Sequence, residues 1–341
     1  MRVGLDLRAT LGTPTGAGEY ASGLYASLRG IGTEAVALGV AGFDLWRFDR
    51  RVVWDQIGLP LAAARAKVSL LHCTSGTVPL VASVPIVATV HDLAWSRVQG
   101  HTPPYARAYF GTLQERLVRR ARAVIVDSQF SRGELLARIA VDPARVSVVF
   151  PGVDEAFGNL VRAPQAEPTI LVVGTVEPRK NLELVVRVLA RLPRVRALAV
   201  GPATPYRERC RSLAHELGVA ERLDLRGFVA RTELLALYAQ ATLAAVPSRY
   251  EGFGYAAAQA LCAGVPLVCA RGSALSEVVG EAAPLVALDD LDGWAEAVAA
   301  ILRDRDAAQL RAESLRRWAR ERFAWEACAR ETAALYARAL A

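Results

Sequence analysis

Two polar side chains frame a small, glycine-rich stretch in the second half of the chain. Glu251 stands directly before Gly252, Phe253 and Gly254, and Gln259 follows eight residues after the acid. The plain interpretation makes Glu251 a solvated loop carboxylate and Gln259 a surface residue of a helix. The alternative is a ligand site, and it depends on what the other motifs of the chain can bind.

A pair of adjacent cations gives the second motif its chemistry. Arg179 and Lys180 lie near the end of the stretch 174–181, which follows a strand-like run and precedes a helical pattern. Lys180 is one of only two lysines among the 41 basic residues of the chain. A planar arginine fork beside a lysine point charge suits a diphosphate group. A solvated basic loop is the alternative.

A histidine occupies a comparable position in the first half of the chain. His91 directly follows the apolar run 85–90, at what would be the carboxyl end of a strand. A lone histidine is often structural, but a histidine at the end of a strand, beside an open edge, is well placed for catalysis.

A glycine cluster precedes the first helical pattern. Gly16 and Gly18 formally fit the dinucleotide-binding motif G-x-G-x-x-A. The fit is loose, because eight residues (8–15) separate the first strand from Gly16. Bare N–H groups at the start of a helix still offer an anion site. Simple capping of the helix by Thr15 is the alternative.

Metal binding is not expected. Asp290 and Asp292 resemble a metal-binding pair of acids, but they precede a helix expected to begin near Gly293, so capping explains them. The five cysteines are scattered and lack C-x-x-C spacing, which argues against a disulfide framework and against a zinc site. We interpret them as small core residues.

Two passes of alternating strand-like and helical segments position these motifs. Apolar runs separated by helices predict parallel sheets covered on both faces. The expected strands are 2–7, 36–41, 68–73, 85–90, 123–126 and 146–150 in the first pass, and 170–173, 197–200, 223–225, 243–246, 267–269 and 285–287 in the second. The polar segment 159–168 holds two prolines and predicts a linker. The pattern therefore indicates an α/β protein with two doubly wound domains, whose ligands bind beyond the carboxyl ends of the strands.

Composition agrees with a two-domain globular protein. The chain has 341 residues, of which 53% are hydrophobic and 22% charged. Its first residues lack a signal peptide, and its longest uncharged stretch, 255–270, is too short and interrupted to span a bilayer, so we expect a cytoplasmic protein. The segment 105–123 carries five arginines and one glutamate. It predicts an amphipathic helix whose basic face is solvated, or contacts an anionic membrane or acceptor.

These motifs, in this order, resemble the family 4 glycosyltransferases, which are retaining nucleotide-sugar transferases of GT-B fold. The resemblance covers essentially the whole chain. TGAGEYASGL, HDLAW, VDSQFSRGELL and VVFPGVD are similar to the N-terminal domain of that family, and GTVEPRKN, GFV, VPSRYEGFG and ALSEVVGEAAPLV are similar to its donor domain. The resemblance implies two Rossmann-like domains facing a central cleft. Residues 1–163 would form the acceptor side and 164–323 the donor side, with a last helix, about 324–341, packing back on the first domain.

The resemblance also implies roles for individual residues. Arg179 and Lys180 would bind the donor diphosphate, Glu251 would contact the transferred sugar, and His91 would lie near the reacting carbon. Gln259 stands where the family has a second glutamate, which binds the ribose. The full donor-binding set is Gly16, Gly18, Gly174, Arg179, Lys180, Gly252, Phe253, Gly254 and Gln259.

The expected function is transfer of a hexose, mannose or glucose, from a GDP- or UDP-linked donor to a hydroxyl acceptor, with retention of configuration. The acceptor would be a glycan, a lipid-linked molecule or a small molecule, in cell-envelope or polysaccharide biosynthesis. Cationic side chains would stabilise the leaving diphosphate, so no metal or other cofactor is expected. We expect no nucleic-acid partner, and a peripheral contact with the inner face of an anionic membrane stays an alternative to a solvated basic face.

Two alternatives from other classes remain open. One is a catalytically weak or inactive nucleotide-sugar-binding protein on the same scaffold, motivated by Gln259. The other is an NAD-dependent oxidoreductase that uses the glycine cluster at 16–21.

Overall fold

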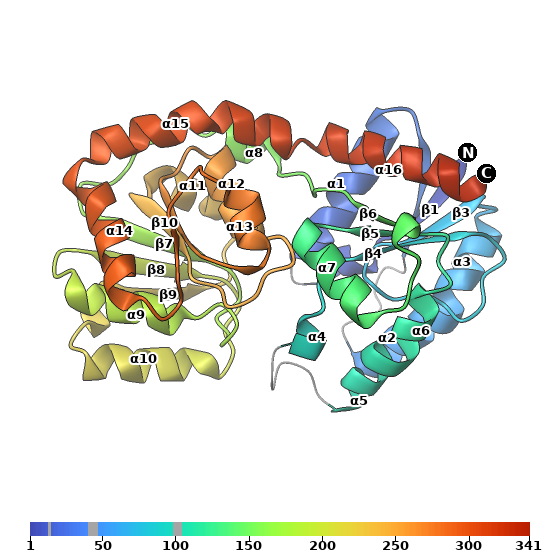
Figure 1. Ribbon diagram of the computed structural model, residues 1–341, viewed down its shortest axis with the longest axis horizontal. Coiled ribbons are helices and arrows are strands. Elements are labelled where there is room, and N and C mark those ends of the chain that lie inside the picture. The colour runs from blue at the N-terminus through green and yellow to red at the C-terminus, as the bar shows by residue number, and fades with distance from the viewer. Residues whose placement is uncertain (13–14, 40–46, 98–103) are drawn as a thin grey trace. The chain divides into compact units, whose positions relative to one another are not determined.

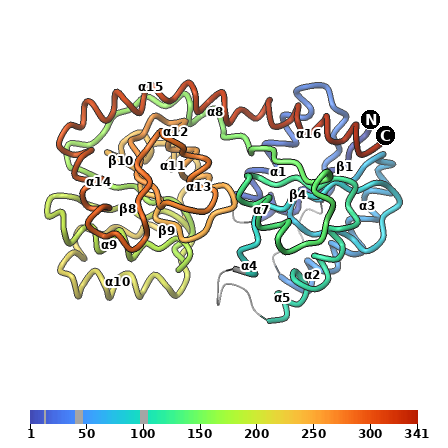
Figure 2. Tube along the Cα trace, in the orientation of Figure 1, coloured from blue at the N-terminus to red at the C-terminus, as the bar shows by residue number. Residues whose placement is uncertain are grey.

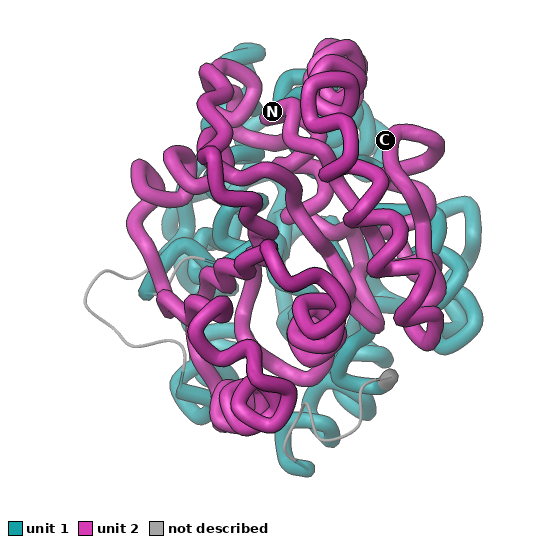
Figure 3. The backbone as a smooth tube through the Cα atoms, turned by 90° about the vertical axis from the view of Figure 1, so that its left-hand side faces the viewer, with its two compact units in different colours: residues 1–152, 323–341 teal, residues 153–322 magenta. Residues whose placement is uncertain are grey.

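The chain folds into two compact units. The computed structural model describes residues 1–12, 15–39, 47–97 and 104–341. The first unit comprises Met1–Gly152 and Phe323–Ala341, and the second comprises Val153–Arg322. Figure 3 colours them teal and magenta.

The first boundary lies earlier in the chain than the sequence predicted. We expected it after Ala163, whereas the first unit ends at Gly152. The short helix α8 (Glu155–Gly158) packs on helices α12 (Tyr255–Cys262) and α15 (Arg305–Arg322) of the second unit. The proline-containing segment after α8 is also bonded to the second unit, since the N–H of Ala163 donates to the carbonyl of Ala239 over 3.0 Å.

A six-stranded parallel sheet forms the centre of the first unit, in the order β2-β1-β3-β4-β5-β6 (Figure 1). Each strand arises from a predicted apolar run, although the run predicted at 36–41 forms β2 from Glu34 and its last two residues lie outside the described part. The strands are β1 (Arg2–Asp6), β2 (Glu34–Leu38), β3 (Leu70–Cys73), β4 (Ile86–Val90), β5 (Ala123–Val126) and β6 (Val146–Val148).

Helices cover both faces of this sheet. Neighbouring residues of a strand point to opposite faces, so adjacent residues of β4 pack in different cores. Val87 packs in one core with helices α1 (Gly16–Gly30) and α16 (Trp325–Leu340). Ala88 packs in another core with helices α6 (Glu115–Val118) and α7 (Gln129–Arg138). The remaining helices of the unit are α2 (Phe48–Val53), α3 (Leu59–Arg65), α4 (Ala94–Arg97) and α5 (Pro104–Ala108), with π-helical turns at Trp54–Gly58 and Tyr109–Gln114.

The last helix, α16, belongs to the first unit and lies beside α1 (Figure 2). A Cβ atom on Gly23 or Gly152 would lie only 2.2 Å from Trp325, so both positions need glycine for close packing. The Tyr336 hydroxyl lies 2.6 Å from Nδ1 of the fully buried His72 in β3. The helix is therefore part of the core of that unit.

A second six-stranded parallel sheet forms the centre of the second unit, in the order β12-β11-β10-β7-β8-β9. This is the doubly wound order, and the direction of winding reverses between β7 and β10. The strands are β7 (Thr169–Val173), β8 (Arg196–Val200), β9 (Leu223–Gly227), β10 (Leu243–Val246), β11 (Leu267–Ala270) and β12 (Leu285–Val286). All six correspond to predicted strands.

The other helices of the second unit are α9 (Leu182–Arg191), α10 (Tyr206–Glu216), α11 (Arg231–Gln240), α13 (Ser273–Val279) and α14 (Leu291–Arg303). None of the helices in the described ranges combines the length and apolar character needed to cross a bilayer. All five cysteines are buried and free, in agreement with their interpretation as core residues.

Candidate functional site

The acid and the two cations of the sequence analysis meet at the carboxyl ends of β7 and β10. Arg179 and Lys180 lie in the loop 174–181 after β7, and Glu251 lies in the loop 247–254 after β10. The two strands are hydrogen-bonded neighbours, and the sheet reverses its winding between them. In doubly wound sheets this is the position where ligands bind.

The two loops are held together by backbone and side-chain contacts. Asn181 adopts a left-handed conformation with φ of 56°. Its side-chain amide donates to the carbonyl of Pro247 over 3.2 Å, and its oxygen accepts from Arg249 over 2.8 Å. At the start of the first loop, a Cβ on Gly201 would lie 2.1 Å from the carbonyl oxygen of Gly174. These contacts fix the position of the cations relative to the acid.

Glu251 is buried and paired with both cations. Its side chain accepts from Lys180 Nζ over 2.6 Å and from Arg179 Nη1 over 3.1 Å. Burial alone would raise the pKa of Glu251, but the charges of Lys180 and Arg179 hold it below its ordinary value. The residue is 6% exposed, so the interpretation of Glu251 as a solvated loop carboxylate is wrong.

Arg179 and Lys180 differ in how they are held. The Arg179 guanidinium lies between two carboxylates, with Nη2 2.7 Å from Glu177 and Nη1 also donating to the Tyr250 carbonyl over 3.0 Å. The Lys180 ammonium pairs with Glu251 and stands against Gly174, where a Cβ would lie 3.2 Å from Lys180 Cε. Arg179 is therefore a rigid part of the site, and Lys180 is the more adjustable cation.

The glycine-rich stretch leads from Glu251 into α12. Gly254 precedes the helix with φ of 98°, and a Cβ there would lie 2.6 Å from Leu275. Phe253 is buried and stacks edge-on against Tyr255 at 5.2 Å. Gly252, Phe253 and Gly254 thus form the tight turn that places Glu251 at the start of a helix.

Gln259 is not a surface residue. It is 4% exposed, and its Oε1 accepts a hydrogen bond from the Tyr238 hydroxyl over 3.1 Å. Tyr238 belongs to α11 and packs edge-on against Phe157 of α8 at 5.1 Å. The surface interpretation of Gln259 is therefore wrong, and its side chain is held in a buried polar contact.

His91 lies in the first unit, at the carboxyl end of β4, with both ring nitrogens facing acceptors. Nδ1 is 2.7 Å from a carboxylate oxygen of Asp127, and Nε2 is 2.8 Å from the carbonyl oxygen of Thr74. The ring also contacts Tyr20 of α1 edge-on at 4.7 Å. Burial alone would lower the pKa of His91, but Asp127 and the Thr74 carbonyl outweigh it and raise the pKa above its ordinary value. The arrangement suits a fixed cation and not a general base.

A pH titration checks this assignment. Because the folded-state pKa of His91 is raised, the pairing stabilises the fold fully below the ordinary value of about 6.5, and this contribution is lost as the pH rises through the folded-state value. Asp127→Asn removes the negative charge, so the pKa of His91 is expected to fall, as measured by NMR titration of the ring protons. Asp142→Asn, at an exposed helix cap, is the control. An unchanged His91 pKa in Asp127→Asn would contradict the assignment.

The glycine cluster of the first unit forms the start of α1. Thr15 Oγ1 accepts from the N–H of Gly18 over 3.2 Å, as in the capping interpretation. A Cβ on Gly18 would lie 2.5 Å from the carbonyl oxygen of Ala9, so glycine is needed for close approach. Gly16 is the first residue of the helix. An anion at this position stays a prediction.

The acidic run 289–292 contains the cap of a helix. Asp290 accepts from the N–H of Gly293 over 2.8 Å at the start of α14, and Asp292 pairs with Arg191 at 2.6 Å. The capping interpretation is confirmed. Within the described ranges no three His, Cys, Asp or Glu side chains converge as metal ligands.

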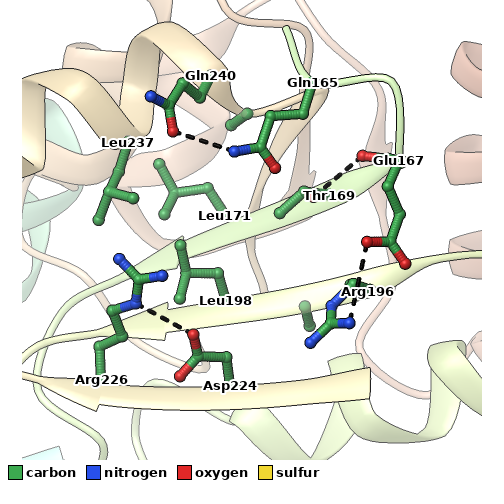
Figure 4. Close-up of a pocket in the computed structure, with 12 residues that line it drawn as sticks. Gln165, Glu167, Thr169, Leu171, Arg196, Leu198, Asp224, Arg226, Leu237 and Gln240 are labelled. Atoms are coloured by element: carbon green, nitrogen blue, oxygen red, sulfur yellow. Dashed lines mark hydrogen bonds and ion pairs between the residues drawn. The ribbon is translucent and has the colours of Figure 1, made fainter. Parts of the chain in front are cut away.

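A cavity of about 240 Å³ lies at the amino ends of strands of the second sheet, at the end of the sheet opposite to the cluster of Glu251, Lys180 and Arg179 (Figure 4). It opens beside the amino ends of the strands, at Thr169, Arg196 and Asp224, over a floor that includes Leu171 and Leu198. The cluster of Arg179, Lys180 and Glu251 lies beyond the carboxyl ends of the strands of that sheet. The cavity is therefore not the candidate site.

Two site residues escaped the sequence analysis. Asp127 follows β5 as His91 follows the neighbouring β4, and this shared position at two strand ends is the signal that could have found it. Glu177 lies two residues before Arg179 and pairs with it. An acid so close to a functional cation could have been recognised as its partner.

Comparisons with known proteins agree on the family. Residues 13–157 match the family described as Glycosyltransferase Family 4, and residues 155–322 match the family described as Glycosyl transferases group 1. A D-inositol 3-phosphate glycosyltransferase from Mycobacterium marinum is 33% identical over 282 residues, which is 76% of this chain and 59% of that protein. The chain thus spans less than two thirds of the length of this relative.

Two solved structures share the fold across both units. Sucrose-phosphate synthase from Thermosynechococcus elongatus matches with a TM-score of 0.82 at 20% identity, covering 99% of this chain and 98% of that one. Anabaena HepE, solved in complex with UDP and glucose, matches with a TM-score of 0.77 at 19% identity, covering 99% of each chain. The predicted GT-B fold is confirmed. From its two family matches and this fold, the chain belongs to the family 4, group 1 glycosyltransferases.

Proposed function

We propose that the protein is a retaining glycosyltransferase that moves a hexose, glucose or mannose, from a nucleotide-diphosphate sugar to a hydroxyl acceptor. One observation carries the proposal. A charged, buried Glu251 is paired with Lys180 and Arg179 at the point where the second sheet reverses its winding. The family match and the complex of HepE with UDP and glucose support a donor of this class.

The residues divide the charge that develops during transfer. Breaking the bond between sugar and diphosphate places negative charge on the leaving group and positive charge on the sugar ring. Lys180, with Arg179 behind it, stabilises the diphosphate, and Glu251 favours the cationic ring. Because two cations already face the leaving group, we propose that transfer needs no metal ion.

The acceptor is proposed only by class, as a glycan, a lipid-linked molecule or a small molecule with a free hydroxyl. Of the two alternatives, the oxidoreductase is disfavoured by the family match and by the chain segment that separates β1 from α1. The other alternative, a nucleotide-sugar-binding protein without turnover, is tested by the turnover assay described below.

A thermal-shift panel tests the donor class. A ligand bound by the folded state alone raises the melting temperature. We expect GDP or UDP, or one of their hexose conjugates, to raise the melting temperature clearly, while NAD does not.

Turnover of the donor identified in this way tests the mechanism. The donor should be consumed without added metal and in the presence of EDTA, and NMR should show that the product keeps the donor's anomeric configuration. An inverted product would contradict the retaining mechanism, and binding without turnover would favour the binding protein.

Gln259→Glu tests whether this residue reaches the ribose. A carboxylate can accept from two ribose hydroxyls with charge-assisted bonds, which are stronger than the neutral bonds of an amide by about 1 kcal/mol. We expect the variant to bind nucleoside diphosphate several-fold more tightly, and a 2′-deoxy nucleotide to gain much less, by calorimetry. If both ligands bind as they do to the parent protein, Gln259 serves only its buried contact with Tyr238.

A further inference from the structure

The helical segment 48–65, formed by α2, the π-helical turn 54–58 and α3, has apolar side chains both in a core and exposed at the surface. Trp54 and Leu59 are buried in a core of the first unit. Val53, Ile57 and Leu61 of the same segment are 54%, 56% and 49% exposed. They are spaced four residues apart, so they form one stripe along the helix. A surface helix normally turns polar residues to solvent, yet these three aliphatic side chains are exposed.

The stripe continues into the neighbouring loop. Leu80 and Val81 are 53% and 71% exposed. The loop lies against the helix, since the N–H of Leu80 donates to Oε1 of Gln56 over 2.8 Å. We call Val53, Ile57, Leu61, Leu80 and Val81 the apolar ridge. An exposed patch of contiguous aliphatic side chains indicates a contact surface.

Arginines border the apolar ridge. Arg120 donates from Nη1 to the carbonyl of Leu80 over 3.3 Å. It belongs to the basic segment 105–123, which packs beside the helical segment 48–65 through Phe48 and Tyr105, whose ring centroids lie 4.8 Å apart. The arginines of this segment are all exposed: Arg107, Arg116, Arg119, Arg120 and Arg122. Its acid, Glu115, pairs with Arg138, so the segment presents a net positive charge.

We propose that the apolar ridge and its arginines dock on the surface of an anionic lipid bilayer. The aliphatic side chains would enter the boundary between headgroups and acyl chains, and the arginines would pair with lipid phosphates. A second copy of the chain would bring like charges together. Nucleic acid would pair with the arginines but leave the aliphatic ridge in water. This proposal does not rest on the proposed transfer reaction.

Vesicle co-sedimentation tests the proposal with the whole protein. The vesicles are phosphatidylcholine alone, and phosphatidylcholine mixed with an equal part of phosphatidylglycerol. We expect binding to the mixed vesicles that weakens in high salt, and little binding to the neutral ones. Arg119→Gln with Arg120→Gln should weaken binding by about fivefold for each arginine. Ile57→Ser with Leu61→Ser should weaken it by about tenfold or more.

Leu310→Ser with Arg317→Gln is the matched control, because both residues are exposed on α15 of the second unit. It should bind as the parent protein does. All these sites are exposed, so the melting temperatures of the variants should match that of the parent. Equal binding to both vesicle types, or unchanged binding by both ridge variants, would overturn the proposal. A dimer seen by light scattering and lost in Ile57→Ser with Leu61→Ser, without vesicle binding, would assign the ridge to a contact between copies.

Discussion

Glu251→Gln is expected to slow sugar transfer about a hundredfold or more while leaving the affinity for nucleoside diphosphate unchanged or slightly higher. The substitution keeps the size of the side chain and removes the negative charge that favours a cationic sugar ring. It also releases Lys180 and Arg179 from their carboxylate partner, so both cations attract a diphosphate more strongly. Turnover kinetics and calorimetry of nucleoside diphosphate binding separate the two effects.

The structure supplies a matched control for this variant. Glu177 also pairs with Arg179, but it precedes the cations in the loop and we assign it no contact with the sugar. Glu177→Gln should therefore retain most of the rate. Removing a partner from a buried ion pair costs about 3 kcal/mol, so the melting temperature of Glu251→Gln should fall as well, and rates are compared well below it. If Glu251→Gln weakens diphosphate binding as much as it slows turnover, the acid only organises the cations.

Lys180→Ala is expected to weaken nucleoside diphosphate binding about tenfold to a hundredfold, with little effect on the nucleoside alone. A charge-assisted hydrogen bond to a phosphate contributes about 1.5 to 3 kcal/mol, and tenfold in affinity corresponds to about 1.4 kcal/mol. Arg179→Ala should act in the same direction. It should also lower thermal stability more, because it leaves two carboxylates without their shared partner.

Lys67→Ala is the control, because Lys67 is the other lysine of the chain and lies in the first unit. Its diphosphate affinity should equal that of the parent. Equal weakening of nucleoside and nucleoside diphosphate by Lys180→Ala would contradict the phosphate assignment and would place the lysine at the base or the ribose instead.

Local pattern was enough to predict the sheets of this protein. Every predicted strand appears, because strands covered on both faces are continuous apolar runs that differ plainly from the periodic helices between them. The family resemblance assigned Glu251, Lys180 and Arg179 to one donor site, but it did not predict that the acid pairs with the two cations. Their direct contact depends on β7 and β10 being neighbours, a consequence of the doubly wound order and not of any short stretch.

Contacts between distant segments account for what the sequence did not reveal. Gln259 reads as an ordinary helix residue until Tyr238 of α11 is placed against it. Asp127 becomes the partner of His91 only when β4 and β5 lie side by side. Segment 159–168 reads as a linker from its prolines, but its backbone bonds to the second unit, where the N–H of Ala163 donates to the carbonyl of Ala239. In each case tertiary packing outweighs local composition.

The return of α16 to the first unit determines the order in which the two units can be completed during synthesis. The ribosome makes all of the second unit before it makes α16, although most of the first unit has already emerged. The second unit is one continuous stretch of chain and can close its core as it emerges. Until α16 is made, the side chains of the first unit that pack against it, among them Val87 and Tyr20, lack part of their cover. Nascent chains usually complete their N-terminal domain first, whereas here the core of the first unit can be completed only after the whole second unit has been made.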